Sequence, residues 1–248
     1  MRLANKVAIV TGAAQGFGEG IAQLFAQEGA KVVVADINGA GAEKVAAAIG
    51  RNAMPFTIDV TDGKQFQAMV DQTLAAFGDL AVMVNNAGTT HRNQSMLSVD
   101  EAWFDKIFAV NVKSIFHSAH SCVPIFKKRG GGVIINIAST AGIRPRPGLT
   151  WYNASKGAAI LASKSMAVEL APDKIRVNAI CPVAGETPLL KEFMGQDTPE
   201  IRAKFVATIP LGRLSTPLDI AKACLFLASD DAEFLTGVAL EVDGGRCI

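Results

Sequence analysis

The 248-residue sequence lacks several features that mark common classes of protein. Its four cysteines lie far apart, with neither a Cys-x-x-Cys pair nor the spacing of metal ligands, so we expect reduced thiols in a cytoplasmic protein and no metal site. The 24 basic residues barely exceed the 23 acidic ones, which leaves no surplus for a nucleic acid. No apolar run approaches the ~20 residues of a membrane span, and the apolar run near the start is too short for a signal peptide. These absences favour a soluble enzyme.

Apolar, β-branched runs alternate with stretches of helical periodicity along the whole chain. Most of the runs are continuously apolar, which is typical of parallel strands covered on both faces. The alternation predicts an α/β fold, a single domain (1–248) with a doubly wound, parallel, seven-stranded sheet of the Rossmann type and helices on both faces. The expected strands are residues 7–10, 31–37, 54–60, 80–84, 132–137, 176–180 and 238–242, and helices are expected at 18–28, 62–77 and 151–170.

Residues 184–213 break this rhythm, because short amphipathic pieces between the sixth and seventh strands are interrupted by Gly185, Pro188, Gly195, Pro199 and Pro210. A long excursion in a compact domain is often a lid over a site. We therefore predict a substrate lid at 184–213. A plain surface helical hairpin is the alternative.

A glycine-rich turn follows the first strand, with the sequence TGAAQGFG at residues 11–18. Glycines at a strand-to-helix turn let the main chain approach a pyrophosphate, and the helix N-terminus supplies N–H donors. The turn predicts a dinucleotide site, although a tight turn that needs positive φ angles would look the same. The residues expected at the cofactor are Gly12, Gln15, Gly16, Phe17 and Gly18.

Asp36 ends the second strand, where a carboxylate can accept hydrogen bonds from the ribose hydroxyls of a dinucleotide. Its carboxylate would repel the 2′-phosphate of NADP. The loop offers no lysine or arginine to bind that phosphate, since position 15 is glutamine, so NAD is favoured over NADP. Asp59, after the third strand, is suited to an adenine amino group or to capping the following helix. Ile37 and Val60, next to these carboxylates, complete this part of the predicted site.

The fourth strand ends in the run NNAG at residues 85–88. The carboxyl ends of parallel strands are where open α/β sheets bind ligands. Gly88 would allow a close approach of the cofactor, and we place Asn86 and Ala87 beside it. The two asparagines are equally suited to stabilising the turn itself.

Tyr152 and Lys156 stand four residues apart, which places both on one face of a helix. A nearby ammonium favours a phenolate and lowers the phenol pKa, as a general base for an alcohol proton requires. Tyr152 is the one tyrosine of a chain with 13 phenylalanines, which suggests that its hydroxyl is needed. Ser139, at the end of the fifth strand, is placed to hold the substrate oxygen. The alternatives are an ordinary helix face and a helix cap.

Together these residues resemble the short-chain dehydrogenase/reductase family over essentially the whole chain. The resemblance rests on the turn at 11–18, Asp59, the run at 85–88, Asn111, Ser139 and the motif YNASK at 152–156. It implies that Tyr152 is the general acid/base and that Lys156 lowers its pKa and holds the nicotinamide ribose. It further implies that Asn111 keeps a water in a proton relay.

The resemblance also implies that Pro182 and Thr187 hold the amide group of the nicotinamide. Val183 stands where the family often has glycine. It implies a homotetramer with subunit contacts through the helices around 111–128 and 152–170.

The favoured function is oxidation of a secondary alcohol by NAD. The runner-up, a 3-oxoacyl-carrier-protein reductase, is kept open by the basic run at 127–129, and a non-catalytic NAD-binding regulator is the third hypothesis. The sequence leaves the substrate undefined. Residues near the motifs that are candidates for contacting it are Thr90, His91, Arg92, Arg144, Arg146 and Trp151.

Overall fold

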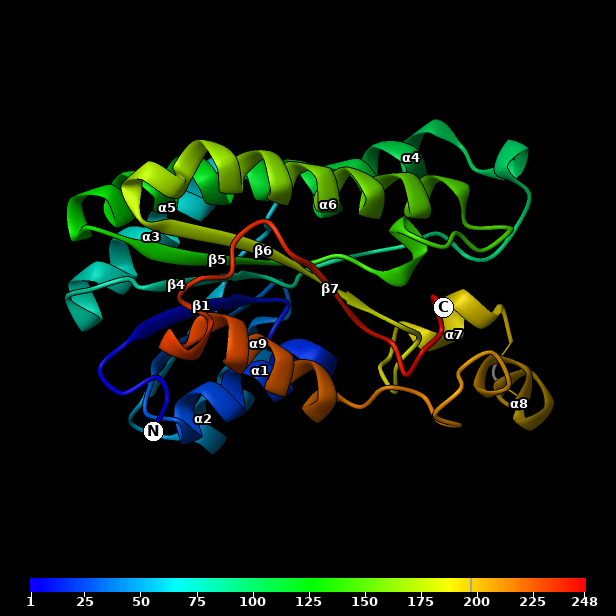
Figure 1. Cartoon of the computed structure of the whole chain (residues 1–248), viewed down its shortest axis with the longest axis horizontal. Helices are drawn as coiled ribbons and strands as arrows, with labels where there is room; N and C mark the ends of the chain where they lie inside the picture. Colours follow the sequence, from blue (N-terminus) through cyan, green and yellow to red (C-terminus); the bar gives the residue numbers. More distant parts are fainter. Residues whose placement is uncertain (197) are drawn as a thin grey trace.

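A computed structural model describes residues 1–196 and 198–248 and confirms the predicted sheet (Figure 1). Seven parallel strands stand in the order β3-β2-β1-β4-β5-β6-β7. The strands are β1 (Val7–Thr11), β2 (Lys31–Asp36), β3 (Ala53–Thr57), β4 (Val82–Asn85), β5 (Gly132–Ile137), β6 (Ile175–Pro182) and β7 (Ala239–Val242).

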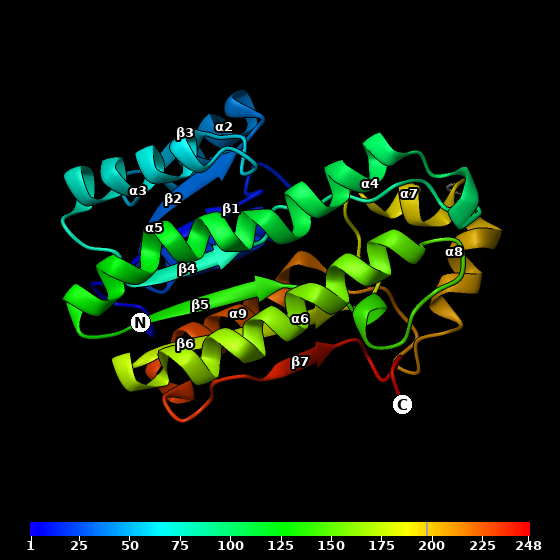
Figure 2. The same cartoon turned by 90° about the horizontal axis from the view of Figure 1, so that it is seen from above.

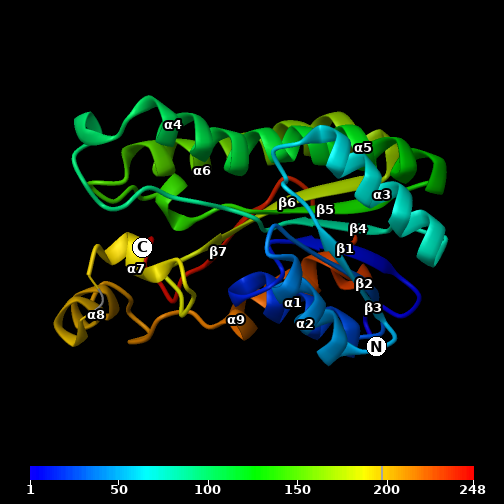
Figure 3. The same ribbon diagram turned by 180° about the vertical axis from the view of Figure 1, so that it is seen from behind.

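Helices cover both faces of the sheet, as the continuously apolar strands predict (Figures 1 and 3). One face carries α1 (Gly16–Gln27), α2 (Gly39–Ile49) and α9 (Pro217–Ala228), and the other carries α3 (Gly63–Phe77), α5 (Ser114–Arg129) and α6 (Thr150–Leu170), with α4 (Glu101–Phe108) beyond α5. Short turns of 3₁₀ helix lie at Met96–Ser98, Thr140–Gly142, Ala171–Asp173 and Asp230–Ala232.

Successive residues of each central strand enter different cores. Val32 and Val34 belong to the cluster under α1, α2 and α9, whereas Ile9 and Val33 belong to the cluster under α3, α5 and α6. All four side chains are fully buried. This two-sided burial explains why the strands lack the alternation of an exposed sheet.

The order of the strands creates a switch point between β1 and β4. From β1 the chain builds outward to β3 and then crosses to pair β4 with the other side of β1. At such a point the loops after the two strands diverge and leave a crevice at the carboxyl edge of the sheet. The glycine turn and the NNAG run therefore lie on either side of one crevice.

The segment 184–213 forms two short helices, α7 (Leu190–Met194) and α8 (Pro199–Val206), outside that edge of the sheet (Figure 3). It has a small core of its own, in which Leu190, Met194 and Ile209 are buried. A bridge between Gly185 and Ser215 joins its two ends. This segment, called the lid segment below, thus has a defined base and a separate core, and its role as a substrate lid stays a prediction.

The ends of the helices follow from local sequence. Asp62 caps α3 by accepting hydrogen bonds from the main-chain N–H groups of Lys64 and Gln65, so the cap that was an alternative role for Asp59 is made by Asp62. Pro172 follows the end of α6, as expected. Within the described residues, no helix is both long and apolar enough to cross a membrane.

Candidate active site

A cavity of about 590 Å³ lies at the carboxyl edge of the sheet, and nearly all the predicted site residues line it. Those at the cavity are Gly12, Gln15, Gly16, Phe17, Asp36, Ile37, Asp59, Val60, Asn86, Ala87, Gly88, Ser139, Tyr152, Lys156, Pro182 and Thr187. Gly18 and Asn111 lie behind this lining and contact it. The sequence-based prediction thus selected residues from seven separate segments that line one cavity.

The glycine turn is built by close packing against the end of β4. Gly12 has a φ of +64°, and a Cβ there would lie 2.8 Å from the Cα of Ala87. A Cβ on Gly18 would collide with the main-chain oxygen of Gly12. Asn86 donates from Nδ2 to the main-chain oxygens of Thr11, at 2.9 Å, and Gly12, at 3.0 Å. The turn therefore requires a positive φ angle at Gly12, and it lines the cavity. That these residues contact a dinucleotide stays a prediction.

Asp36 stands at one end of the cavity with its carboxylate fixed by the main chain. Its Oδ2 accepts a hydrogen bond from the N–H of Ala14 at 3.0 Å, and its Oδ1 accepts one from Asn38 at 2.9 Å. Neither the turn at 11–18 nor residues 37–42 contain lysine or arginine. Oδ1 of Asp59 accepts from the N–H and hydroxyl of Thr61 at 2.9 and 2.8 Å. This end of the cavity is acidic.

Tyr152, Lys156 and Ser139 meet at the other end. Lys156 is buried, and its Nζ donates to the main-chain oxygen of Ile137 at 2.8 Å, which ties α6 to the end of β5. Ser139 follows β5, and its side chain forms a hydrogen bond with Tyr152. Ser139 Oγ also accepts a hydrogen bond from the N–H of Ala141 at 3.1 Å. Ser139 therefore caps the short turn that follows it, and it also lies beside the phenol of Tyr152.

Burial controls the ionisation of this group. It raises the pKa of Tyr152 to about 12, although the hydrogen bond with Ser139 acts in the opposite direction. It lowers the pKa of Lys156 to about 8. The expectation that Lys156 lowers the Tyr152 pKa is therefore wrong for the protein by itself. The Nζ lies 5.8 Å from the centre of the phenol ring and is bonded to Ile137, so its charge does not offset the loss of water.

Asn111 lies in a π-helical turn, Ala109–Lys113, between α4 and α5, where the resemblance implied the start of a long helix. Its Oδ1 accepts from the N–H of Thr89 at 2.9 Å, and its Nδ2 donates to Thr89 O and Ser155 Oγ, both at 2.9 Å. A Cβ on Gly88 would lie 3.4 Å from Lys156 Nζ and 3.5 Å from Asn111 Oδ1. Asn111 and Lys156 therefore both lie close to Gly88, and the water relay stays a prediction.

The start of the lid segment packs directly on the glycine turn. A Cβ on Gly16 would lie 3.3 Å from Cγ2 of Thr187, and a Cβ on Gly185 would overlap the ring of Phe17. Val183, the departure from the family pattern, is buried in the small core of the lid and donates its N–H to Val242 at 3.3 Å. Pro182 and Thr187, before and after it in the sequence, both line the cavity.

The candidate substrate residues divide into two groups. Arg146 lines the cavity, whereas Arg144 donates to the main-chain oxygens of Arg246 and Ile248 at 2.7 and 3.1 Å. His91 is buried behind the lining, with Nδ1 2.8 Å from Arg92 O. The other three also make structural contacts: Thr90 bonds to His91 O, Arg92 to Gly195 O and Trp151 to Met96 O.

Sequence reasoning missed two aromatic residues of the lid. The ring of Phe193 packs at 5.1 Å from that of Tyr152, and Phe205 also lines the cavity. The only signal in the sequence was their place within the predicted lid, because contacts across some forty residues are not visible in local patterns.

The profile of a family described as enoyl-(acyl carrier protein) reductase matches residues 12–246. The chain belongs to the short-chain dehydrogenase/reductase family. It is thus an oxidoreductase, as predicted.

Relatives of this short-chain dehydrogenase/reductase cover its whole length. It is 50% identical over 253 residues to 4-formylbenzenesulfonate dehydrogenase of Comamonas testosteroni, with all of both chains covered. It is 38% identical over 252 residues to 3-oxoacyl-[acyl-carrier-protein] reductase of Thermotoga maritima, again with both chains fully covered. A crystal structure of 3-ketoacyl-(acyl-carrier-protein) reductase from Brucella melitensis complexed with NADH is 48% identical. It superposes with a TM-score of 0.95, over 99% of this chain and 100% of that chain.

The raised pKa of the phenol is directly measurable, because Tyr152 is the one tyrosine in the sequence. We expect the phenolate absorbance of the native protein to rise with a midpoint of about 12, well above the ~10 of free tyrosine. Ser139→Ala should raise the midpoint further, because the hydrogen bond from Ser139 stabilises the phenolate. The control is the same titration in denaturant, with circular dichroism recording the folded fraction. A native midpoint at or below that of the denatured chain would contradict the assignment of burial as the main cause.

Proposed function

We propose that this protein interconverts an alcohol and its carbonyl compound with NAD, and that Tyr152 is the general acid/base. The observation that carries the proposal is that Tyr152, Ser139 and Lys156 meet in the same cavity as the glycine turn and Asp36. The sequence favours a secondary alcohol. The name of the Comamonas relative adds aryl aldehydes to the substrates to be tested.

The residues present fit a dinucleotide. Gly12 and Gly16 have positive φ angles and leave the main chain bare at the cavity, and the open N-terminus of α1 provides N–H donors for a pyrophosphate. Asp36 is positioned to accept the ribose hydroxyls. Gly88 has no side chain and so leaves space beside Lys156. We assign this space to the nicotinamide ribose, which Lys156 would hold. NADH in the Brucella relative supports this assignment.

The chain's own residues would handle the proton. Ser139 and Tyr152 hold the substrate oxygen by hydrogen bonds, and Tyr152, as phenolate, takes the hydroxyl proton of the alcohol. In the opposite direction the neutral phenol donates its proton to the carbonyl oxygen. NAD, when bound, supplies a positively charged ring that accepts hydride from the carbinol carbon. Since burial raises the pKa of Tyr152, we expect a neutral phenol in the protein by itself, and a positive charge bound nearby would favour the phenolate.

A 3-oxoacyl-carrier-protein reductase is the second candidate, because the Thermotoga and Brucella relatives carry such names. The basic run at 127–129, which kept this function open, does not support it. It ends α5 at the edge of the sheet where β5 begins, opposite to α7 and α8 (Figure 2). Lys127 pairs with Asp173 at 2.8 Å and Arg129 with Asp79 at 3.0 Å. A non-catalytic NAD-binding regulator would have no use for the arrangement around Tyr152.

We also propose the homotetramer implied by the resemblance. Helices α5 and α6 lie side by side on one face (Figures 1 and 2), and they leave Phe116, Leu161 and Val168 exposed by 55%, 66% and 80%. Exposed apolar side chains on adjacent helices are suited to a subunit contact. The mass of the protein in solution tests this. The cytoplasmic location stays a prediction.

Tyr152→Phe tests the catalytic role. We expect turnover to fall by ~10²–10⁴, the usual contribution of general acid/base catalysis, because the variant keeps the ring and its packing but has no proton to exchange. The affinity for NAD should change no more than a few-fold. The readout is absorbance of the reduced nicotinamide across a panel of alcohols, aldehydes and 3-oxoacyl thioesters, with binding of NAD measured separately. Retention of half the wild-type turnover would refute the assignment.

Asp36→Asn and Asp36→Ala test the preference for NAD. Close like charges cost several kcal/mol, so we expect the wild type to prefer NAD over NADP by ~10²-fold or more in kcat/KM. Asp36→Asn removes only the charge and should reduce this ratio, whereas Asp36→Ala should also weaken NAD because an acceptor is lost. The measurement is kcat/KM for both cofactors in the three proteins. Equal use of both by the wild type, or an unchanged ratio in both variants, would show that Asp36 does not select the cofactor.

A further inference from the structure

Arg146 is the one candidate substrate residue that lines the cavity. It lies on the loop between Ser139 and Tyr152, and this loop is held in place on several sides. Asn153 donates to the main-chain oxygen of Arg146 at 2.8 Å, and Asn93 donates to that of Pro147 at 3.2 Å. A fixed loop that joins the two catalytic positions is suited to present a substrate-binding side chain.

The guanidinium of Arg146 contacts the lid. Its central carbon lies 4.6 Å from the centre of the Phe205 ring, and its Nη2 lies 3.4 Å from Thr208 Oγ1. Contact with an aromatic face is typical of arginine and leaves the edge of the guanidinium available to other acceptors. Arg146 thus lies at the part of the cavity wall that Phe205 of α8 forms.

The charge of Arg146 has no carboxylate partner within ion-pair distance in residues 1–196 and 198–248. Its surroundings add charge of the same sign. Burial and the neighbouring Arg246 lower the pKa of Arg146, and Lys191 lines the same cavity. Glu192 is the only acidic residue of the lid at the cavity, among the residues described, and it forms no ion pair with Arg146. A partly buried cation with a cationic neighbour and no counter-ion favours an anion.

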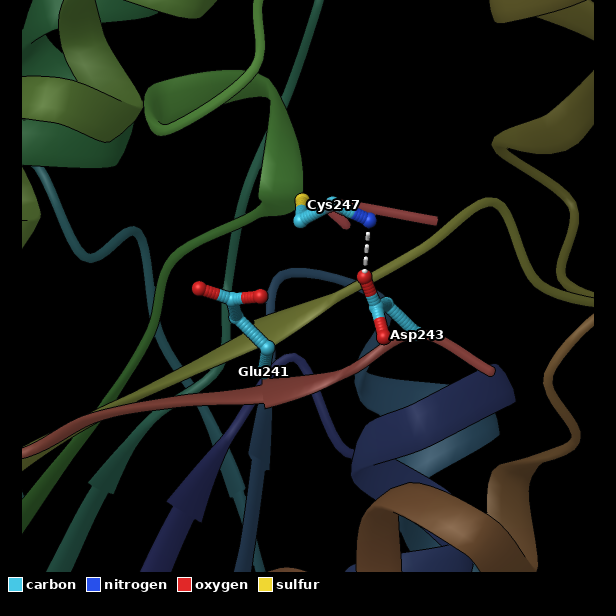
Figure 4. Close-up of side chains that lie close together, drawn as sticks. All are labelled: Glu241, Asp243 and Cys247. Carbon is cyan, nitrogen blue, oxygen red and sulfur yellow. Dashed lines mark hydrogen bonds between the residues drawn. The ribbon is translucent and has the colours of Figure 1, made fainter. Parts of the chain in front are cut away.

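Arg246 belongs to the C-terminal turn, of which Figure 4 shows Glu241, Asp243 and Cys247. Asp243 accepts main-chain N–H groups at both carboxylate oxygens, from Gly245 at 2.9 Å and Cys247 at 2.7 Å. Glu241, Asp243 and Cys247 lie close enough together to suggest metal ligands, but the carboxylate of Asp243 is thus committed to this turn. The Nε of Arg246 is buried without a hydrogen-bond partner in the described part of the chain. A second guanidinium therefore adds to the positive potential at Arg146.

Between Arg146 and the catalytic residues the cavity is apolar. Leu149 and Phe193 pack around Tyr152, and Phe205 lies under Arg146. Such a wall favours an aromatic ring or a group of similar size and thickness.

We propose that Arg146 binds an anionic group of the substrate, a carboxylate or a sulfonate, at the end of the molecule remote from the reacting oxygen. The substrate class is then an aromatic or similarly apolar alcohol or aldehyde with an acidic substituent. Arg146 fixes the anionic end while Ser139 and Tyr152 hold the oxygen that gains or loses the proton. This inference rests on the proposed function and specifies its substrate.

The test compares two alcohols that differ only in charge, 4-(hydroxymethyl)benzoate and 4-(hydroxymethyl)benzamide, by kcat/KM with NAD. We expect the wild type to prefer the anion. In Arg146→Met, kcat/KM for the benzoate should fall by about 10- to 100-fold, the effect of one charge-assisted hydrogen bond, mainly through KM. The benzamide should change less than about threefold, since KM of a neutral substrate does not depend on the guanidinium. Arg146→Lys should restore part of the preference.

Arg144→Met is the matched control, because Arg144 belongs to the same loop and contacts the C-terminal residues but does not line the cavity. It should leave the ratio between the two substrates unchanged. Equal losses on both alcohols in Arg146→Met, or no loss on either, would overturn the inference while the proposed function stands. If the wild type oxidises neither alcohol with NAD or NADP and reduces neither of the corresponding aldehydes with NADH or NADPH, but turns over other compounds of the panel, the inference fails and the proposed function stands. If it turns over no compound of the panel, both fail.

Discussion

The bond from the buried ammonium of Lys156 to the main-chain oxygen of Ile137 holds the reacting end of the molecule together. An uncompensated charge in a protein interior is strongly unfavourable, so the lysine fixes the distance between the first turns of α6 and the end of β5. Ser139 follows β5 by two residues, and Tyr152 precedes Lys156 by one helical turn. The phenol and the serine hydroxyl are therefore brought together by the same bond that satisfies the lysine.

The cavity is chemically graded from one end to the other. Asp36 and Asp59 make the end near β2 and β3 acidic, and the absence of basic residues in the adjoining turns preserves that character. Arg146 and Lys191 give the lid end the opposite sign. With a formal net charge of +1, the molecule as a whole carries little field, so recognition of charged groups depends on these local arrangements.

Much of this was predictable from the sequence, because strands that are buried on both faces are continuously apolar and glycine turns have a recognisable spacing. The motif at 152–156 was equally plain, since residues four apart on a helix share a face. The π turn at Asn111 was not predictable, because one extra residue per turn leaves no mark in the apolar periodicity. Nor could the sequence separate Arg144 from Arg146: which of two arginines on a Pro-rich loop faces a cavity depends on contacts with α8 and the C-terminal turn.

The predicted direction of the Tyr152 pKa shift failed for a related reason. Spacing shows that an ammonium is near a phenol, but it does not show how much water both groups have lost. That quantity depends on Leu149, at the start of α6, and on Phe193 of α7, which are far apart in the sequence. Tertiary packing, and not the motif, therefore determines the ionisation of the catalytic group in the protein by itself.

The central claim is that this chain moves hydride from a carbinol carbon to NAD while Tyr152 takes the proton. The most direct measurement uses alcohols deuterated at the carbinol carbon and mass spectrometry of the reduced cofactor. The account predicts that the reduced cofactor carries one deuterium and that Tyr152→Phe forms almost none of it in the same time. Reduced cofactor without deuterium, or equal transfer by Tyr152→Phe, would contradict it.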